Sequence, residues 1–309
     1  MNLNKRNLSL LWSAQIISAA GDAVYQLALL WLVLDMTNSS IVTGLVAMSA
    51  YLPALIFGLY AGVMADKMNR LWLMMIANAG QALTVLLIPF SLWFGYKNIL
   101  LVAGLAFLRS CFNTLFQPAF NSFIPMLFPK KRLVRVNALL ATSGQLAWML
   151  GPFFAGVLLS IFSLPNLFII DSTSFIAAIF LLFFLRRPAR LTQLEEHSHW
   201  QELKDGLSYL AEQKPLFWLI IITFINNLFI MGPAIVGLPV LIKHILHGSA
   251  SDFAFAEGCM ASGALLGSFI VSKFSKKFTK GAIWGIGLCL DGITYSFFYW
   301  APSVEIVMF

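Results

Sequence analysis

Three charged side chains lie inside long apolar segments, where a charge is costly and usually serves a function. Asp22 lies midway along residues 9–34, and Arg109 lies midway along residues 98–123. Asp291 lies within the last long apolar segment. A carboxylate in an apolar pocket can take up and release a proton, and a guanidinium at the same depth can pair with it. We therefore expect Asp22 to carry a coupled proton beside Arg109, with Asp291 as a second candidate. The alternative is a static ion pair that only fixes helix packing.

Polar side chains extend both charges into stripes along their segments. The residues of these two stripes are Gln15, Ser18, Gln26, Asn113 and Gln117. The first three belong with Asp22 and the last two with Arg109. Successive members of each stripe, the charge included, are three or four residues apart, which puts each stripe on one face of a helix. Two helices with one polar face each predict a water-accessible cavity between them. We expect Gln26, Asn113 and Gln117 to line it, with Asn226 and Asn227 facing it from residues 215–242.

Two further carboxylates, Asp171 and Glu257, fall near the outer ends of their apolar segments. There a carboxylate can reach interfacial water or cap the backbone at the end of a helix. We expect this structural role for both of them.

The elements that carry these residues are membrane-spanning helices. Of the 309 residues, 60% are hydrophobic and 11% are charged, whereas about 25% are charged in a typical soluble domain. About 20 apolar residues are needed to cross a bilayer. The chain is therefore predicted to be an all-α polytopic membrane protein. The predicted spans are residues 9–34, 41–65, 71–95, 98–123, 137–162, 166–185, 215–242, 253–273 and 281–300.

The basic residues predict the orientation of these spans. All but three of the 20 Lys and Arg residues lie at the N-terminus or in every second gap; the exceptions are Lys97, Arg109 and Lys243. Because cytoplasmic loops are enriched in Lys and Arg, the N-terminus is predicted to be cytoplasmic. This distribution also explains the net charge of +7 without nucleic-acid binding.

One gap is long and polar, and it divides the chain. Residues 186–214 contain Leu203, Leu207 and Leu210 at helical spacing, which predicts an amphipathic helix on the cytoplasmic face. We expect a six-helix bundle over residues 1–185, this linker, and a partial second bundle over residues 215–309.

Three motifs occur in an order that resembles the major facilitator superfamily. The first is the loop Gly62-Val-Met-Ala-Asp66-Lys67-Met-Asn-Arg70, the second is Arg109, and the third is Gly151-Pro152-Phe-Phe-Ala-Gly156. Gly21-Asp22, Trp31 and Thr37-Asn-Ser39 also resemble the first helix of the branch that exports macrolides and siderophores.

This resemblance implies twelve helices in two six-helix bundles that alternate access to the two sides of the membrane. It implies that Asp66 helps to latch the cytoplasmic side and that the Gly151–Gly156 motif governs flexing and leak. On this basis the first bundle is complete and about nine of twelve helices are present, so we expect a fragment or a truncated gene. Residues 303–309 resemble the first turns of a tenth helix.

The expected function is export of a small lipophilic compound, such as a hydrophobic drug or macrolide, in exchange for protons. The alternatives are export of a siderophore or other native metabolite, and a truncated membrane protein that transports nothing. No nucleotide-binding loop, no Ser/His/Asp set in one loop and no convincing metal-ligand spacing occurs, so we expect no ATP-driven pump, enzyme activity, cofactor or metal. The expected setting is the lipid bilayer of a bacterial cytoplasmic membrane, as a monomer that binds no nucleic acid.

Overall fold

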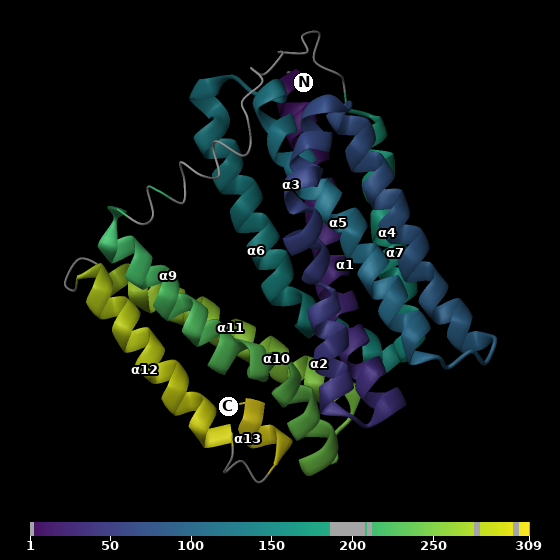
Figure 1. The fold of residues 1–309 in the computed structure, drawn as a ribbon, viewed down its shortest axis with the longest axis vertical. Coiled ribbons are helices and arrows are strands. Elements are labelled where there is room, and N and C mark those ends of the chain that lie inside the picture. Colours follow the sequence, from purple (N-terminus) through teal and green to yellow (C-terminus); the bar gives the residue numbers. More distant parts are fainter. Residues whose placement is uncertain (1–2, 186–207, 209–211, 275–278, 299–302, 309) are drawn as a thin grey trace.

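The computed structural model describes residues 3–185, 208, 212–274, 279–298 and 303–308. Every regular element in these ranges is a helix (Figure 1). Eight helices are long and apolar enough to cross a membrane, and a shorter apolar helix covers Gly281–Thr294. The prediction of an all-α polytopic membrane protein is therefore confirmed. The predicted amphipathic helix at residues 203–210 lies almost entirely outside the described residues.

The first helix group surrounds one central helix, α1 (Leu3–Thr37). This helix is apolar on nearly all sides, and an all-round apolar helix is usually buried. It packs against α5, α6 and α7. The other long helices of this group are α4 (Arg70–Trp93), α5 (Ile99–Leu127), α6 (Lys130–Ile161) and α7 (Leu164–Phe183).

The predicted span at residues 41–65 is confirmed as the span Ser40–Lys67, but a break divides it into two helices. They are α2 (Ser40–Ser49) and α3 (Leu52–Lys67). Pro53 has no backbone N–H to continue a helix, and it lies in the first turn of α3, a position that proline favours. The Ser110 hydroxyl of α5 donates a hydrogen bond to the Ala50 carbonyl at the break. That bond satisfies a carbonyl near the end of α2.

The second helix group begins with a nearly continuous helix over residues 214–245. It contains two π-helical turns, η1 (Asn227–Met231) and η2 (Leu241–Ile245). The remaining helices of this group are α9 (Lys214–Asn226), α10 (Gly232–Val240), α11 (Ala250–Phe274), α12 (Lys280–Phe298) and α13 (Val304–Met308).

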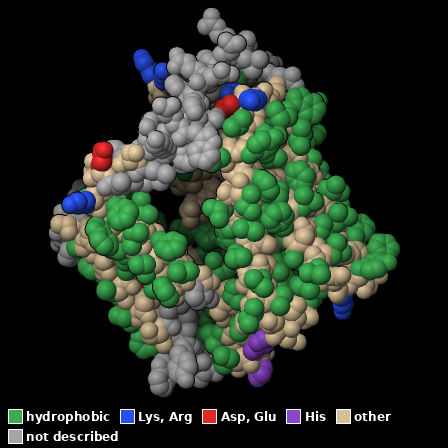
Figure 2. All heavy atoms as spheres, in the orientation of Figure 1, with side chains coloured by type: hydrophobic (Ala, Val, Ile, Leu, Met, Phe, Trp, Pro, Cys, Tyr) green, Lys and Arg blue, Asp and Glu red, His purple; other side chains and the backbone are tan. Residues whose placement is uncertain are grey.

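The two helix groups meet at one end and separate at the other (Figure 1). At the closed end, α11 crosses α6, and Trp31 of α1 stacks on Phe253 with ring centroids 5.9 Å apart. The open end carries the N-terminus and the loop between α3 and α4. A hollow is visible between the groups, and hydrophobic side chains cover the flank of the first group (Figure 2). Side chains such as Leu55 (83% exposed) and Leu100 (78% exposed) suit contact with lipid.

Candidate functional site: a charge triad and a cavity between the helix groups

Three charged side chains from three helices meet inside the first group. Arg109 of α5 donates a hydrogen bond to Asp22 of α1, and its guanidinium also lies 3.8 Å from a carboxylate oxygen of Asp171 of α7. We call Asp22, Arg109 and Asp171 the charge triad. When both carboxylates are ionised, the triad has one negative charge in excess. The structure thus brings Asp22 and Arg109 together and adds Asp171 to them.

The expected interfacial role of Asp171 is wrong. Its side chain is 0% exposed, because α7 packs closely against both α1 and α4. The predicted span began at residue 166, whereas α7 begins at Leu164, which puts Asp171 seven residues inside the helix. At 1.5 Å per residue this is about 10 Å of depth. A carboxylate at such a depth needs a partner, and Arg109 supplies it.

Aromatic rings hold the Arg109 guanidinium in place. Its central carbon lies 3.9 Å from the centre of the Tyr25 ring and 5.6 Å from that of Phe175. A guanidinium over an aromatic face is attracted by the negative charge of that face. Tyr25 is in turn packed edge-on against Phe168. The guanidinium is therefore fixed by packing as well as by charge.

The triad lies in a polar layer between two hydrophobic clusters. One cluster gathers around residues 24–33 of α1, and the other gathers around Leu11 and Ala14. Buried polar side chains in this layer come from α1, α4, α5 and α7, and they are Ser18, Asn78, Gln81, Ser110 and Ser172. A polar layer at this depth is where a proton or water can reside in a membrane protein.

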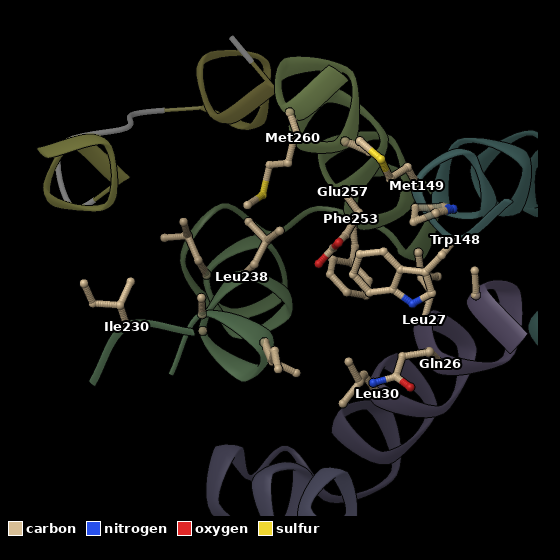
Figure 3. A pocket seen from close by; sticks show the side chains of 18 of the residues that line it. Gln26, Leu27, Leu30, Trp148, Met149, Ile230, Leu238, Phe253, Glu257 and Met260 are labelled. Carbon is tan, nitrogen blue, oxygen red and sulfur yellow. The ribbon is translucent and has the colours of Figure 1, made fainter. Parts of the chain in front are cut away.

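A cavity of about 1100 Å³ lies between the two helix groups. The lining residues of three helices recur at helical spacing, so one face of each helix forms part of the wall (Figure 3). These residues are Ala23, Gln26, Leu27 and Leu30 of α1; Gln145, Trp148, Met149 and Pro152 of α6; and Phe253, Glu257, Met260, Ala261 and Ala264 of α11. Tyr51, parts of residues 229–245 and Gly292 of α12 complete the wall.

Only one of the five predicted cavity residues lines this cavity. Gln26 does, and its amide nitrogen lies 3.5 Å from the Tyr51 hydroxyl. The other four, Asn113, Gln117, Asn226 and Asn227, are not among the residues that line it.

Packing and helix register explain why these four residues do not line the cavity. Helix α5, which carries Asn113 and Gln117, packs against α3 and α4, on the side of α1 away from the second group (Figure 1). The π-helical turn after Asn226 changes the helix register and presents Phe229 and Ile230 to the cavity instead.

Glu257, like Asp171, lies deeper in its helix than the sequence interpretation predicts. It was expected at the interface, but it lies on the cavity face of α11, seven residues after the helix begins at Ala250. The predicted span began at residue 253, so the depth of Glu257 was underestimated. The spacing of Phe253, Glu257 and Met260 was a usable signal, because it puts all three on one helix face.

Asp291 lies apart from both features. It is half-buried on α12, beside Gly292, and it is neither in the charge triad nor among the residues that line the cavity.

The loop Gly62–Arg70, the predicted cytoplasmic gate, lies at the open end. Asp66 and Lys67 are exposed there, whereas Arg70 is 8% exposed and lies 3.7 Å from Asp66. One guanidinium nitrogen of Arg70 contacts the sulfur of Met126 at 3.0 Å. A Cβ at Gly62 would meet no atom within 4 Å, so close helix packing does not require this glycine.

The predicted motif on α6 joins both helix groups. Gly151 packs directly against Ala23 of α1, and a Cβ at Gly156 would lie 3.3 Å from the Cβ of Ala254 on α11. Pro152, between them, lines the cavity. Small residues allow this close approach on both sides of α6.

Comparison with known proteins places this arrangement in a family. Residues 2–295 match the family described as transmembrane secretion effector. The chain is 24% identical over 272 residues to macrolide efflux protein A of Streptococcus pyogenes, covering 85% of this chain and 65% of that protein. It is 23% identical over 273 residues to the staphyloferrin A transporter of Staphylococcus aureus, covering 86% of this chain and 66% of that protein. The chain thus spans about two thirds of the length of these relatives.

A solved structure shares the fold. It is a bacterial homologue of the human lysosomal transporter Spinster, with a TM-score of 0.72 and 17% sequence identity over 100% of this chain and 71% of that one. Together with the family match, this confirms the resemblance that the three motifs suggested. The chain belongs to the transmembrane secretion effector family of major facilitator superfamily transporters.

Proposed function

We propose that the protein is a secondary active exporter of a small lipophilic compound. The observation that carries the proposal is the cavity of about 1100 Å³ between the two helix groups. Ligand sites of drug-sized molecules typically measure about 300–1,000 Å³, so the cavity has room for a large substrate. Its wall is mostly apolar, which suits a hydrophobic drug or a macrolide-like compound. The similarity to macrolide efflux protein A supports the same substrate class.

Export of a siderophore or another native metabolite is the second candidate. The similarity to the staphyloferrin A transporter is the observation that favours it. The two candidates share one mechanism and differ in what the cavity accepts.

The proposed mechanism is alternating access between residues 1–185 and residues 215–309, joined by the linker at 186–214. The two helix groups that enclose the cavity meet at one end and separate at the other (Figure 1). Separation of the two groups at the contact between α6 and α11, together with their approach at the opposite end, would reverse this state, with Gly151, Pro152 and Gly156 permitting the motion. Asp66, Lys67 and Arg70 would hold the opposite end closed in the alternate state.

Protons are the proposed coupling ion, and Asp22 is the proposed carrier. Its side chain is 36% exposed, whereas Asp171 is 0% exposed, so Asp22 is the carboxylate of the charge triad that a proton can reach. The next residue, Ala23, lines the cavity. Protonation of Asp22 would neutralise the excess negative charge of the triad. Arg109 would remain paired with Asp171, so its guanidinium would keep an ionised partner.

The proposed setting is a bacterial cytoplasmic membrane, with a monomer whose N-terminus is cytoplasmic. The Lys- and Arg-rich loops support this orientation. The open end would then face the cytoplasm, where an exporter collects its substrate.

Export driven by a pH gradient tests this function. We expect inverted vesicles with the full-length protein to accumulate a lipophilic macrolide when an inward-acidic gradient is imposed. Asp22→Asn keeps the shape of the side chain but cannot release a proton at neutral pH, so gradient-driven accumulation should fall to the level of empty vesicles. Asp291→Asn is the matched control and should retain export. If Asp22→Asn still exports in proportion to the gradient, Asp22 is not the proton carrier. If wild-type vesicles show no gradient-dependent uptake of lipophilic compounds, the proposed function fails.

A further inference from the structure

The cavity wall carries a single charged side chain among the described residues, Glu257. It lies in the middle of the cavity face of α11, between Phe253 and Met260 (Figure 3). No described residue forms an ion pair or a hydrogen bond with it. A carboxylate in an apolar wall loses much of its hydration. Without a partner in the described protein, it is suited to a partner that enters the cavity.

Aromatic side chains surround the same space. Trp148 of α6 lies beside the Glu257 carboxylate in Figure 3, and its side chain is 58% exposed. Tyr51 and Phe229 also line the cavity. The face of an aromatic ring attracts an organic cation, and indole does so most strongly. The carboxylate and the rings therefore favour the same sign of charge on a ligand.

The apolar remainder of the wall sets the second requirement. Leu30, Met149, Leu238 and Met260 provide surface that gains free energy only when it contacts apolar groups. Methionine side chains adapt to ligands of irregular shape. A small hydrated cation would gain nothing from this wall, and an anion would be repelled by Glu257.

We propose that Glu257 makes the cavity selective for bulky lipophilic cations, such as compounds that carry a tertiary or quaternary ammonium group. The proposal rests on the proposed function in taking this cavity as the substrate site. It narrows the candidate substrates by charge, because a lone carboxylate favours a cationic compound over an anionic one.

Probes of one shape and different charge test this selectivity. Tetraphenylphosphonium and tetraphenylborate are nearly identical in shape and opposite in charge, and triphenylphosphine oxide is a neutral analogue. Binding is measured by equilibrium dialysis against the full-length protein in nanodiscs of zwitterionic phosphatidylcholine. We expect the wild type to bind the phosphonium saturably and at least about tenfold more tightly than the neutral probe, and to bind the borate no better than empty nanodiscs do.

The variants assign the selectivity to one carboxylate. Glu257→Gln should weaken phosphonium binding at least about tenfold, which corresponds to about 1.4 kcal/mol, and leave binding of the neutral probe unchanged. Glu257→Asp keeps the charge and should lose less affinity than Glu257→Gln. Asp291→Asn, which removes a carboxylate outside the cavity wall, should bind the phosphonium as the wild type does.

Three results of the binding experiment would overturn the proposal. They are the absence of saturable phosphonium binding to the wild type, equal wild-type affinity for charged and neutral probes, and an equal loss of both probes in Glu257→Gln. The comparison of probes on the wild type needs no variant, so it tests the charge selectivity of the cavity even if a variant misfolds. Binding is measured without a gradient, so the charge selectivity of binding can be established even if the export experiment fails. Export that ignores substrate charge would reject the role of Glu257 and leave the proposed function intact.

Discussion

At the scale of single residues, the main feature is an arginine shared by two carboxylates. Arg109 is 8% exposed and is surrounded by Asp22, Asp171 and the Tyr25 ring. Breaking a buried ion pair by removing one partner typically costs about 3–5 kcal/mol, because it strands the remaining charge. The cost of removing one member of the triad therefore depends on which other members are present, and this dependence can be tested.

We expect Arg109→Ala to lower the thermal unfolding midpoint of the purified protein strongly, because two carboxylates then face each other without a cation. Adding Asp171→Asn should recover part of the lost unfolding midpoint, because it removes the charge of a buried carboxylate that no longer has a cationic partner. A double-mutant cycle of unfolding midpoints measures this interaction. Arg135→Ala, at an exposed site on α6, is the control and should change little. Strictly additive effects of Arg109→Ala and Asp171→Asn would show that these two residues do not interact.

Part of this site could be predicted from the sequence, and the rest could not, for a physical reason. Asp22 and Arg109 could be recognised because each lies midway along its apolar segment, where no interface is within reach. Asp171 and Glu257 lie two turns inside their helices, and an error of two or three residues in the helix start moved both to the interface. Only the packing of α7 against α1 and α4 shows that Asp171 is buried.

At the scale of helices, the helical type of the spans and the positions of eight of the nine could be predicted from apolar length, but their breaks could not. The division between α2 and α3 depends on Pro53 and on a hydrogen bond from Ser110 that is distant in sequence. Which small residues make close contacts was also hidden. Gly62 and Gly151 looked alike in the sequence, yet only Gly151 lies against a neighbouring helix.

Alanine substitution at these two glycines separates packing from helix propensity. Both changes gain the same intrinsic preference for helix, about 1 kcal/mol. A Cβ at Gly151 would overlap Ala23, and overpacking of this kind typically costs about 1–3 kcal/mol. We expect Gly151→Ala to lower the thermal unfolding midpoint and Gly62→Ala to leave it unchanged or raise it. Equal shifts in the two variants would contradict the contact between α1 and α6.

At the scale of the whole molecule, one end is closed by contacts between the two helix groups. Lys243 of η2 pairs with Asp35 of α1 at 2.9 Å and donates a second hydrogen bond to the Leu34 carbonyl at 3.1 Å. The stacking of Trp31 on Phe253 and the crossing of α6 and α11 lie in the same region. Alternating access requires all of these contacts to separate in each transport cycle.

A disulfide across the closed end tests that requirement. The Cβ atoms at Gly156 and Ala254 would lie 3.3 Å apart, close to the separation of about 3.5–4.5 Å that a disulfide needs. In a background without the native Cys111, Cys259 and Cys289, we expect Gly156→Cys with Ala254→Cys to cross-link on oxidation. Export should then stop, because the groups can no longer part at this end, and a reducing agent should restore it. Each single cysteine variant is the control and should export under both conditions. If the cross-linked protein still exports, substrate leaves by a route that does not pass between α6 and α11.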